Sequence, residues 1–276
     1  EYLRRVERNL SQPYAPFRSD GMYYSSKEIS IFHHERRLMG TLYLPETETP
    51  VPLVIFSHGY NGIGEDFTQN SRFLAERGIG SLCLDFCGGS VKSRSDGKTT
   101  DMTIFSEKED LLAAFQEAAS LKQIRKDAIF LFGGSQGGLV SALAAEDLQD
   151  SIRGLILLFP ALCIADNWND RFHSAEEIPD TFEFWGMVLG KRFFETLLGF
   201  HTFEHIGSFQ KKVLILHGDQ DKVVNLSYSQ KAAGLYPNAK LVVFPGEGHG
   251  FSPEGDSKMS QMVYDFVTNC LKENDI

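Results

Sequence analysis

Short apolar runs separated by polar turns recur along most of this chain. Residues 27–33 and 38–44 alternate apolar and polar positions, which predicts two antiparallel strands joined across residues 34–36. The later runs are continuously apolar, as expected of strands that are buried on both faces of a parallel sheet. These buried strands are predicted at residues 51–56, 80–86, 128–132, 152–159, 212–216 and 240–244.

Helical periodicity fills most of the intervals between the predicted strands. A Ser-x-x-Glu pattern at residues 106–109 resembles a capping box, so we expect it to start the helix that ends near Ile124. Strands that alternate with helices predict an α/β fold, with a mostly parallel central sheet flanked by helices. The other helices are predicted at residues 66–78, 139–148, 225–236 and about 257–272.

The alternation lapses between residues 161 and 210. This stretch contains both tryptophans and eight of the 22 phenylalanines of the chain. We therefore expect an aromatic-rich lid insertion at residues 161–210, between two parts of a core formed by residues 26–160 and 211–276. Residues 1–25 are expected to be an irregular lead-in with one short helix near its start.

Composition narrows the classes of function. A chain of 276 residues that is 42% hydrophobic can bury one large core. The net charge of −10, without long basic runs, excludes nucleic acid and anionic membrane surfaces as expected partners. The longest apolar run, residues 155–165, is too short to span a bilayer and contains Pro160.

The cysteines and histidines give no sign of a metal site. The four cysteines lack CxxC spacing, so we interpret them as reduced thiols. His33 and His34 are adjacent on a predicted strand and would point to opposite faces, so we expect surface histidines. No metal and no cofactor are expected. We expect a cytoplasmic protein, although the chain begins at Glu1 rather than Met, which leaves room for a removed leader.

The strand at residues 128–132 runs directly into Gly133, Gly134, Ser135, Gln136 and Gly137. A Gly-x-Ser-x-Gly pattern between a buried strand and a helix predicts a nucleophile elbow, where the serine sits on a turn so sharp that only small neighbours fit. Such a turn lifts the Ser135 hydroxyl above the carboxyl edge of the sheet. The N-terminus of the following helix then directs backbone N–H groups toward negative charge formed nearby.

Two later turns supply partners for the serine, which needs a base and a third group that orients the base. Asp221 follows one predicted strand and His249, between two glycines, follows the next, so both return to the edge where Ser135 stands. The chain order Ser, Asp, His is that of this architecture. Asp219 stays open as the alternative acid. His217 is expected to pack beneath its loop.

Two earlier turns lie at the same predicted edge. His58-Gly59-Tyr60 follows a buried strand that precedes the elbow, where this architecture places a second oxyanion donor, the backbone N–H of Tyr60. Asp85 also follows a buried strand. A carboxylate at such a loop more often accepts hydrogen bonds from turn N–H groups than acts as a catalytic acid, and we expect that role for Asp85.

These motifs resemble those of the α/β-hydrolase superfamily and, within it, those of bacterial cinnamoyl and feruloyl esterases. The resemblance covers roughly residues 38–270. It includes the motifs at residues 58–60, 85–86, 101–103, 133–138, 178–180, 217–224 and 248–251. It implies Ser135 as nucleophile, His249 as base, Asp221 as its orienting acid, and the N–H groups of Tyr60 and Gln136 as the oxyanion hole.

The sequence departs from those esterases at two positions. Gly134 stands where they often have histidine, and Phe193 where we would align a tyrosine that holds the phenol of the substrate. Trp168 and Trp185 are expected to face the acyl pocket, with Asp166 or Asn167 as a polar partner for a phenol. These five residues, Phe193 included, are the candidate substrate-binding set.

We therefore expect a serine carboxylic-ester hydrolase that works through an acyl-enzyme on a small-molecule aryl, hydroxycinnamoyl-like, or medium-chain ester. A serine peptidase or thioesterase on the same fold is the first alternative, because fold and triad do not select the leaving group. A non-catalytic ligand-binding protein on this fold is the second. A homodimer is left open.

Overall fold

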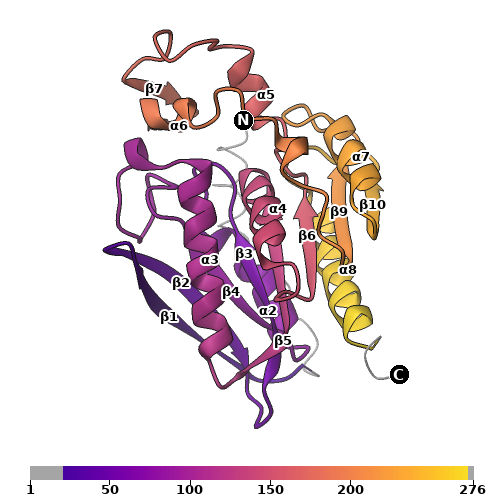
Figure 1. The fold of residues 1–276 in the computed structure, drawn as a ribbon. Helices are drawn as coiled ribbons and strands as arrows, with labels where there is room; N and C mark the ends of the chain where they lie inside the picture. Colours follow the sequence, from indigo (N-terminus) through magenta and orange to yellow (C-terminus); the bar gives the residue numbers. More distant parts are fainter. Residues whose placement is uncertain (1–20, 273–276) are drawn as a thin grey trace.

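The computed structural model describes residues 21–272 and is built on one eight-stranded sheet (Figure 1). Strand order across this sheet is β1-β2-β4-β3-β5-β6-β9-β10. Its strands are β1 (Tyr24–His33), β2 (Arg36–Pro45), β3 (Val51–Ser57), β4 (Gly80–Asp85), β5 (Ile124–Gly134), β6 (Gly154–Leu158), β9 (Val213–Gly218) and β10 (Ala239–Phe244). β2 is antiparallel to β1 and β4, whereas every other adjacent pair is parallel. The prediction of a mostly parallel sheet is therefore confirmed.

Helices cover both faces of the sheet, as predicted (Figure 1). They are α2 (Thr68–Ala75), α3 (Ile104–Ser120), α4 (Gln136–Leu148), α7 (Leu226–Leu235) and α8 (Pro253–Lys272), with single turns η1 (Gly64–Phe67) and η2 (Thr99–Asp101). Residues of α3, α4 and α7 share one apolar cluster with Leu53 and Ile55 of β3, while residues of α2 and α8 share another with Val54 and Phe56. Successive strand residues thus point to opposite, equally buried faces, which explains the continuously apolar runs.

The start of α3 differs from the prediction. Thr103, not Ser106, is the N-cap: its hydroxyl accepts from the Ser106 N–H, and the Ser106 hydroxyl accepts from the Thr103 N–H, both at 2.9 Å. The helix begins earlier because Ile104 is fully buried in the core, a contact that the cap pattern alone does not reveal. As a result, Glu107 lies inside the helix and is itself buried.

Residues 161–210 contain a second, small sheet beyond the carboxyl edge of the large one (Figure 1). The elements here are α5 (Ile164–Asn169), β7 (Thr181–Phe184), β8 (Met187–Gly190), α6 (Lys191–Glu195) and η3 (Thr202–Glu204). β7 and β8 form a hairpin whose two-residue turn is Trp185 and Gly186, both with positive φ. The Thr99 hydroxyl donates to the Val188 carbonyl at 2.7 Å and so ties this hairpin to the core.

Several smaller expectations have clear outcomes. All four cysteines are buried, and none of them forms a disulfide. The short helix expected near the start of the chain lies outside the described residues. Across residues 21–272, every helix is too short or too polar to cross a membrane.

Candidate active site

Ser135 lies on the sharp turn between β5 and α4. Its φ of 51° and ψ of −118° belong to neither helix nor strand, and a positive φ is uncommon for a residue with a side chain. The turn is held by the Ser135 N–H, which donates to the Leu158 carbonyl at 2.9 Å, and by the Ser135 carbonyl, which accepts from the Ala161 N–H at 2.8 Å. This geometry is that of the predicted elbow.

Small residues are required around the elbow because backbones meet there. A Cβ at Gly133 would overlap the Gly137 carbonyl, and one at Gly137 would overlap the Ser57 carbonyl. A Cβ at Gly59 would lie 3.1 Å from the Ser135 Cβ. The turn after β3 therefore lies directly against the nucleophile elbow, as the motifs predicted.

The structure brings together the three side chains that the sequence singled out. His249 Nε2 lies 2.8 Å from Ser135 Oγ, and His249 Nδ1 lies 2.8 Å from Asp221 Oδ2. A proton on Nδ1, donated to the carboxylate, leaves Nε2 able to accept the hydroxyl proton of the serine. The ring of Phe159 supports the imidazole, with 4.5 Å between ring centroids.

Asp221 is held as a carboxylate by donors on all sides. Its Oδ1 accepts from the Val223 and Val224 N–H groups at 2.8 and 2.9 Å. Burial opposes its charge, but hydrogen bonds from His217 and His249 outweigh that effect and hold the pKa of Asp221 below its usual value. This environment favours a permanent negative charge beside His249.

The competing acid is occupied elsewhere. Asp219 Oδ1 accepts from the Gly246 N–H at 2.7 Å, across the base of the loop that carries His249. His217 is fully buried beneath its loop, as expected, between the Ser229 hydroxyl and the Val224 carbonyl. Sequence reasoning did not foresee its Nε2 at 3.1 Å from Asp221 Oδ2, because the i,i+4 spacing lies in a loop whose conformation is not periodic.

The backbone N–H groups of Tyr60 and Gln136 have no hydrogen-bond partner within residues 21–272. Gln136 is the first residue of α4, whose initial N–H groups have no acceptor inside the helix. These are the two donors that the resemblance assigns to an oxyanion hole.

His58 orients one of these donors. Its Nε2 accepts from the Phe86 N–H at 3.0 Å, so the proton lies on Nδ1, which donates to the Gly59 carbonyl at 2.8 Å. Burial lowers the pKa of His58 and keeps the ring neutral. Because the peptide is trans, fixing the Gly59 carbonyl directs the Tyr60 N–H, which belongs to the same peptide group, the opposite way.

The β7–β8 hairpin reaches this turn. The Tyr60 hydroxyl donates to the Phe184 carbonyl at 2.7 Å, and its ring contacts those of Phe184 and Trp185 edge-on. Burial, then Glu107 and Glu183, raise the pKa of Tyr60, so the hydroxyl remains a donor. Trp185 has a φ of 44° and is 52% exposed, an uncommon conformation for a bulky residue that leaves its indole at the surface beside Tyr60.

The other candidate substrate-binding residues are placed differently. Trp168 is half-buried and packs within residues 161–210 against Phe172, Phe184 and Phe194. Phe193 is 1% exposed and packs against Phe194, so we leave it out of the proposed pocket.

The two polar candidates lie on α5. Asp166 accepts from the Tyr228 hydroxyl at 2.9 Å, which links α5 to α7. Asn167 is exposed. Gly134, where the similar esterases often have histidine, faces the Phe67 ring, whose Cζ would lie 3.3 Å from an added Cβ. Phe67 therefore occupies the space into which a side chain at 134 would extend.

Two carboxylates outside the triad have structural partners. Asp85 accepts from the Gly64 and Arg94 N–H groups at 2.8 and 3.1 Å, as expected of a turn-holding residue. Asp110 lies within reach of His33 and Cys87, a grouping of metal-ligand types. However, its Oδ1 lies 2.7 Å from His33 Nε2 and 3.5 Å from Arg36, and its Oδ2 accepts from the Cys87 N–H, so protein groups already neutralise and satisfy it.

The expectation of a surface histidine was therefore wrong for His33 and right for His34. The His33 side chain is only 12% exposed because Asp110 of α3 packs against the hairpin, while that of His34 is 68% exposed.

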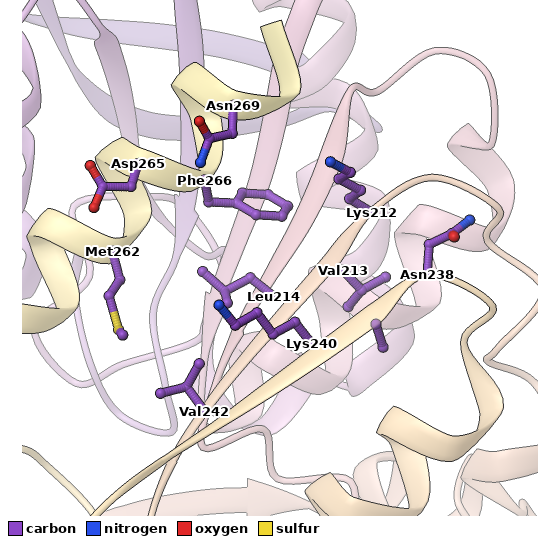
Figure 2. Close-up of a pocket in the computed structure, with 11 residues that line it drawn as sticks. Lys212, Val213, Leu214, Asn238, Lys240, Val242, Met262, Asp265, Phe266 and Asn269 are labelled. Atoms are coloured by element: carbon purple, nitrogen blue, oxygen red, sulfur yellow. The ribbon is translucent and has the colours of Figure 1, made fainter. Parts of the chain in front are cut away.

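A cavity of about 480 Å³ lies away from this site (Figure 2). It is lined by Val213 and Leu214 at the amino end of β9 and by Met262 and Phe266 of α8. The triad loops follow the carboxyl ends of their strands, so the cavity lies at the opposite end of the sheet from Ser135.

Comparisons with known proteins give the family and the fold of this chain. A model of the prolyl oligopeptidase family matches residues 65–274, which include Ser135, Asp221 and His249. The structure of Est1E from Butyrivibrio proteoclasticus with ferulic acid bound is 29% identical, with a TM-score of 0.81 over 88% of this chain and 99% of that one. DcsB in complex with its substrate analogue is 17% identical with a TM-score of 0.74 over 89% and 99%, and shares the fold.

Curated relatives carry peptidase names. An uncharacterised peptidase, YtmA of Bacillus subtilis (strain 168), is 22% identical over 173 residues, or 59% of this chain. Dipeptidyl aminopeptidase BIII of Pseudoxanthomonas mexicana is 24% identical over 248 residues, or 82% of this chain. The matches span 63% and 34% of the lengths of these two relatives.

Proposed function

The chain belongs to the prolyl oligopeptidase family and is a serine hydrolase of the α/β-hydrolase fold, and we propose that it cleaves carboxylic esters through an acyl-enzyme on Ser135. The observation that carries this proposal is the continuous chain of contacts from Asp221 through His249 to Ser135, with 2.8 Å at each step.

In the proposed acylation step, His249 Nε2 takes the Ser135 proton as Oγ attacks the ester carbonyl. Asp221 stabilises the imidazolium that forms. The carbonyl oxygen becomes an oxyanion, which the N–H groups of Tyr60 and Gln136 bind, and the protonated His249 then returns the proton to the departing alcohol. Water attacks the acyl-enzyme by the same route, and Ser135 regains its proton.

We further propose that residues 161–210 act as a lid that supplies the acyl pocket. Support comes from the hydrogen bond between Tyr60 and Phe184, which places the hairpin tip beside one proposed oxyanion donor. The exposed indole of Trp185 gives this tip an apolar aromatic surface. An aryl or medium-chain acyl group would gain more from such a surface than an acetyl group. The similarity to Est1E, whose bound ligand is ferulic acid, supports the aryl choice.

Peptide hydrolysis is the second candidate, favoured by the family and by the names of both curated relatives. The acyl-enzyme chemistry is the same, but an amine leaves less readily than an alcohol, so His249 must protonate the leaving group more fully. We place esters first because the chain is 29% identical to Est1E over 99% of that chain, and the ligand bound to Est1E is ferulic acid.

The proposal is tested with purified protein on matched p-nitrophenyl acyl esters, acyl thioesters and aminoacyl p-nitroanilides, each with Ser135→Ala beside the wild type. We expect kcat/KM to be highest for the esters, and Ser135→Ala to lower turnover by roughly a million-fold. A fluorophosphonate probe should label Ser135, as mapped by peptide mass spectrometry. Higher kcat/KM on the anilides would make the peptidase assignment correct, and full activity in Ser135→Ala would refute the site.

A further inference from the structure

Glu107 is a buried carboxyl group beside the candidate oxyanion hole that the steps above do not use. It lies in α3 and is 1% exposed. Its Oε2 accepts from the side-chain amide of Gln136 at 2.9 Å. Its Oε1 has no hydrogen-bond partner within residues 21–272 and faces Gly89, where an added Cβ would lie 2.9 Å away. Sequence reasoning missed Glu107 because it placed this residue inside a capping box at residues 106–109.

The surroundings of Glu107 favour its neutral form. Burial, together with the like charge of Asp110, raises its pKa well above the usual value, and the hydrogen bond from Gln136 compensates only in part. Asp110 itself contacts His33 and Arg36, so the Arg36 guanidinium pairs with Asp110 rather than with Glu107. With Oε2 accepting a hydrogen bond, the proton belongs on Oε1.

The residues around Glu107 are those that supply the hole. Gln136 contributes one proposed donor through its backbone, while its side chain, 2% exposed, is anchored on Glu107. Tyr60 contributes the other and lies within the electrostatic reach of the Glu107 carboxyl. His58, which orients the Tyr60 peptide, borders the same point: its Cε1 would lie 3.2 Å from a Cβ at Gly89. Because His58 and Tyr60 are neutral, the like charge that acts on the Glu107 carboxyl is that of Asp110.

We propose that Glu107 is a positioning residue of the oxyanion hole, whose neutral carboxyl group holds Gln136 at the start of α4 in the orientation that aims its N–H at the oxyanion. This inference rests on the proposed site. It has an electrostatic consequence: an ionised Glu107 would place negative charge behind the hole and oppose the charge that develops on the substrate oxygen. Activity should therefore fall when Glu107 loses its proton.

Three variants test this role. Glu107→Gln keeps a neutral acceptor for the Gln136 amide, Glu107→Leu removes the acceptor at similar volume, and Glu109→Gln is the matched control on the exposed side of the same helix. For a p-nitrophenyl ester we expect kcat within about twofold of wild type for Glu107→Gln and Glu109→Gln. For Glu107→Leu we expect a loss of about tenfold or more in kcat with little change in KM, less than the loss on deleting an oxyanion donor outright.

A trifluoromethyl ketone provides a readout that is specific for the hole. Ser135 Oγ adds to its carbonyl carbon, the serine proton passes to His249, and the new oxyanion lies between the Tyr60 and Gln136 N–H groups. Its inhibition constant should rise for Glu107→Leu in parallel with the loss in kcat/KM and stay unchanged for Glu107→Gln. As pH rises, wild-type affinity should decline more steeply than that of Glu107→Gln.

The outcomes separate this inference from the proposed function. If esters are not turned over but the ketone adduct still weakens in Glu107→Leu, the ester assignment fails and the positioning role stands. Unchanged kcat and ketone affinity in Glu107→Leu would overturn the role. If Glu107→Leu does not fold, the isosteric Glu107→Gln provides the test. Superimposable pH profiles of ketone affinity for this variant and the wild type would also overturn the role.

Discussion

The indole ring of Trp185 lies edge-on to the phenol ring of Tyr60, with 6.4 Å between the ring centroids. One residue is the exposed tip of the small hairpin, and the other provides a proposed oxyanion donor. This contact connects the part of the chain that we expect to select the acyl group with the part that we expect to stabilise the reaction.

The two tryptophans should therefore behave differently. Trp185→Ala removes the side chain of a residue that is 52% exposed, so the free energy of unfolding should change by only about 0.5 kcal/mol, while the ratio of kcat/KM between aryl and acetyl esters falls about tenfold. Trp168→Ala removes a ring packed against four phenylalanines and should destabilise the protein by roughly 2–3 kcal/mol. Denaturant unfolding and ester kinetics measure both effects, and an unchanged ester ratio in Trp185→Ala would contradict the lid proposal.

The two loop aspartates give a second contrast. Asp221→Asn should lower kcat by roughly a thousandfold or more with little change in KM, because an amide facing Nδ1 stabilises the wrong tautomer of His249. Asp219→Asn keeps an oxygen that can accept from the Gly246 N–H and should have a small effect. Comparable losses in both variants would mean that the loop, rather than the Asp221 carboxylate, matters.

Asp85 should contribute stability that depends on pH. Burial opposes its charge, but the Arg94 side chain and the Gly64 N–H outweigh burial and lower its pKa. With a folded pKa below the unfolded value of about 3.9, its contribution is complete at neutral pH and is lost as pH falls from about 4 through the folded pKa.

Asp85→Asn should therefore be roughly 2–3 kcal/mol less stable than wild type at pH 7, and the difference should shrink below pH 4. Thermal unfolding of both proteins between pH 7 and pH values below 4 measures this difference in stability. Asp127→Asn is the control, since its partner Arg125 is exposed. Equal and pH-independent effects of the two variants would show that the Asp85–Arg94 pair has no special stabilising role.

The contribution of Glu107 to stability should depend on pH in the opposite direction to that of Asp85. Its folded pKa is raised, so the stability associated with its proton is complete below the unfolded pKa of about 4.3 and is lost as pH rises toward the folded pKa. Glu107→Gln has no proton to lose. Unfolding curves of the two proteins should nearly coincide at pH 4, and the variant should be the more stable of the two at pH 8. A variant that is less stable at pH 8 would show that Glu107 is buried as a carboxylate.

The sequence by itself determined the strand pattern, the elbow and the membership of the α/β-hydrolase fold. These features are local: burial on both faces makes a strand continuously apolar, and close backbones around Ser135 admit only glycine at 133 and 137. The choice of Asp221 over Asp219 as the partner of His249 remained an interpretation until the loop conformation placed Asp221 2.8 Å from that histidine.

Tertiary structure alone decided the features that join distant segments. Burial of Ile104 set the N-cap of α3 at Thr103. The helix that follows this cap brings Glu107 against Gln136, 29 residues away in the sequence. Packing also gave the two tryptophans different environments: Trp168 packs against Phe194, whereas Trp185 is exposed at the hairpin tip. Neither outcome follows from periodicity, because a local pattern shows which face of an element is apolar but not which residue of another element will meet it.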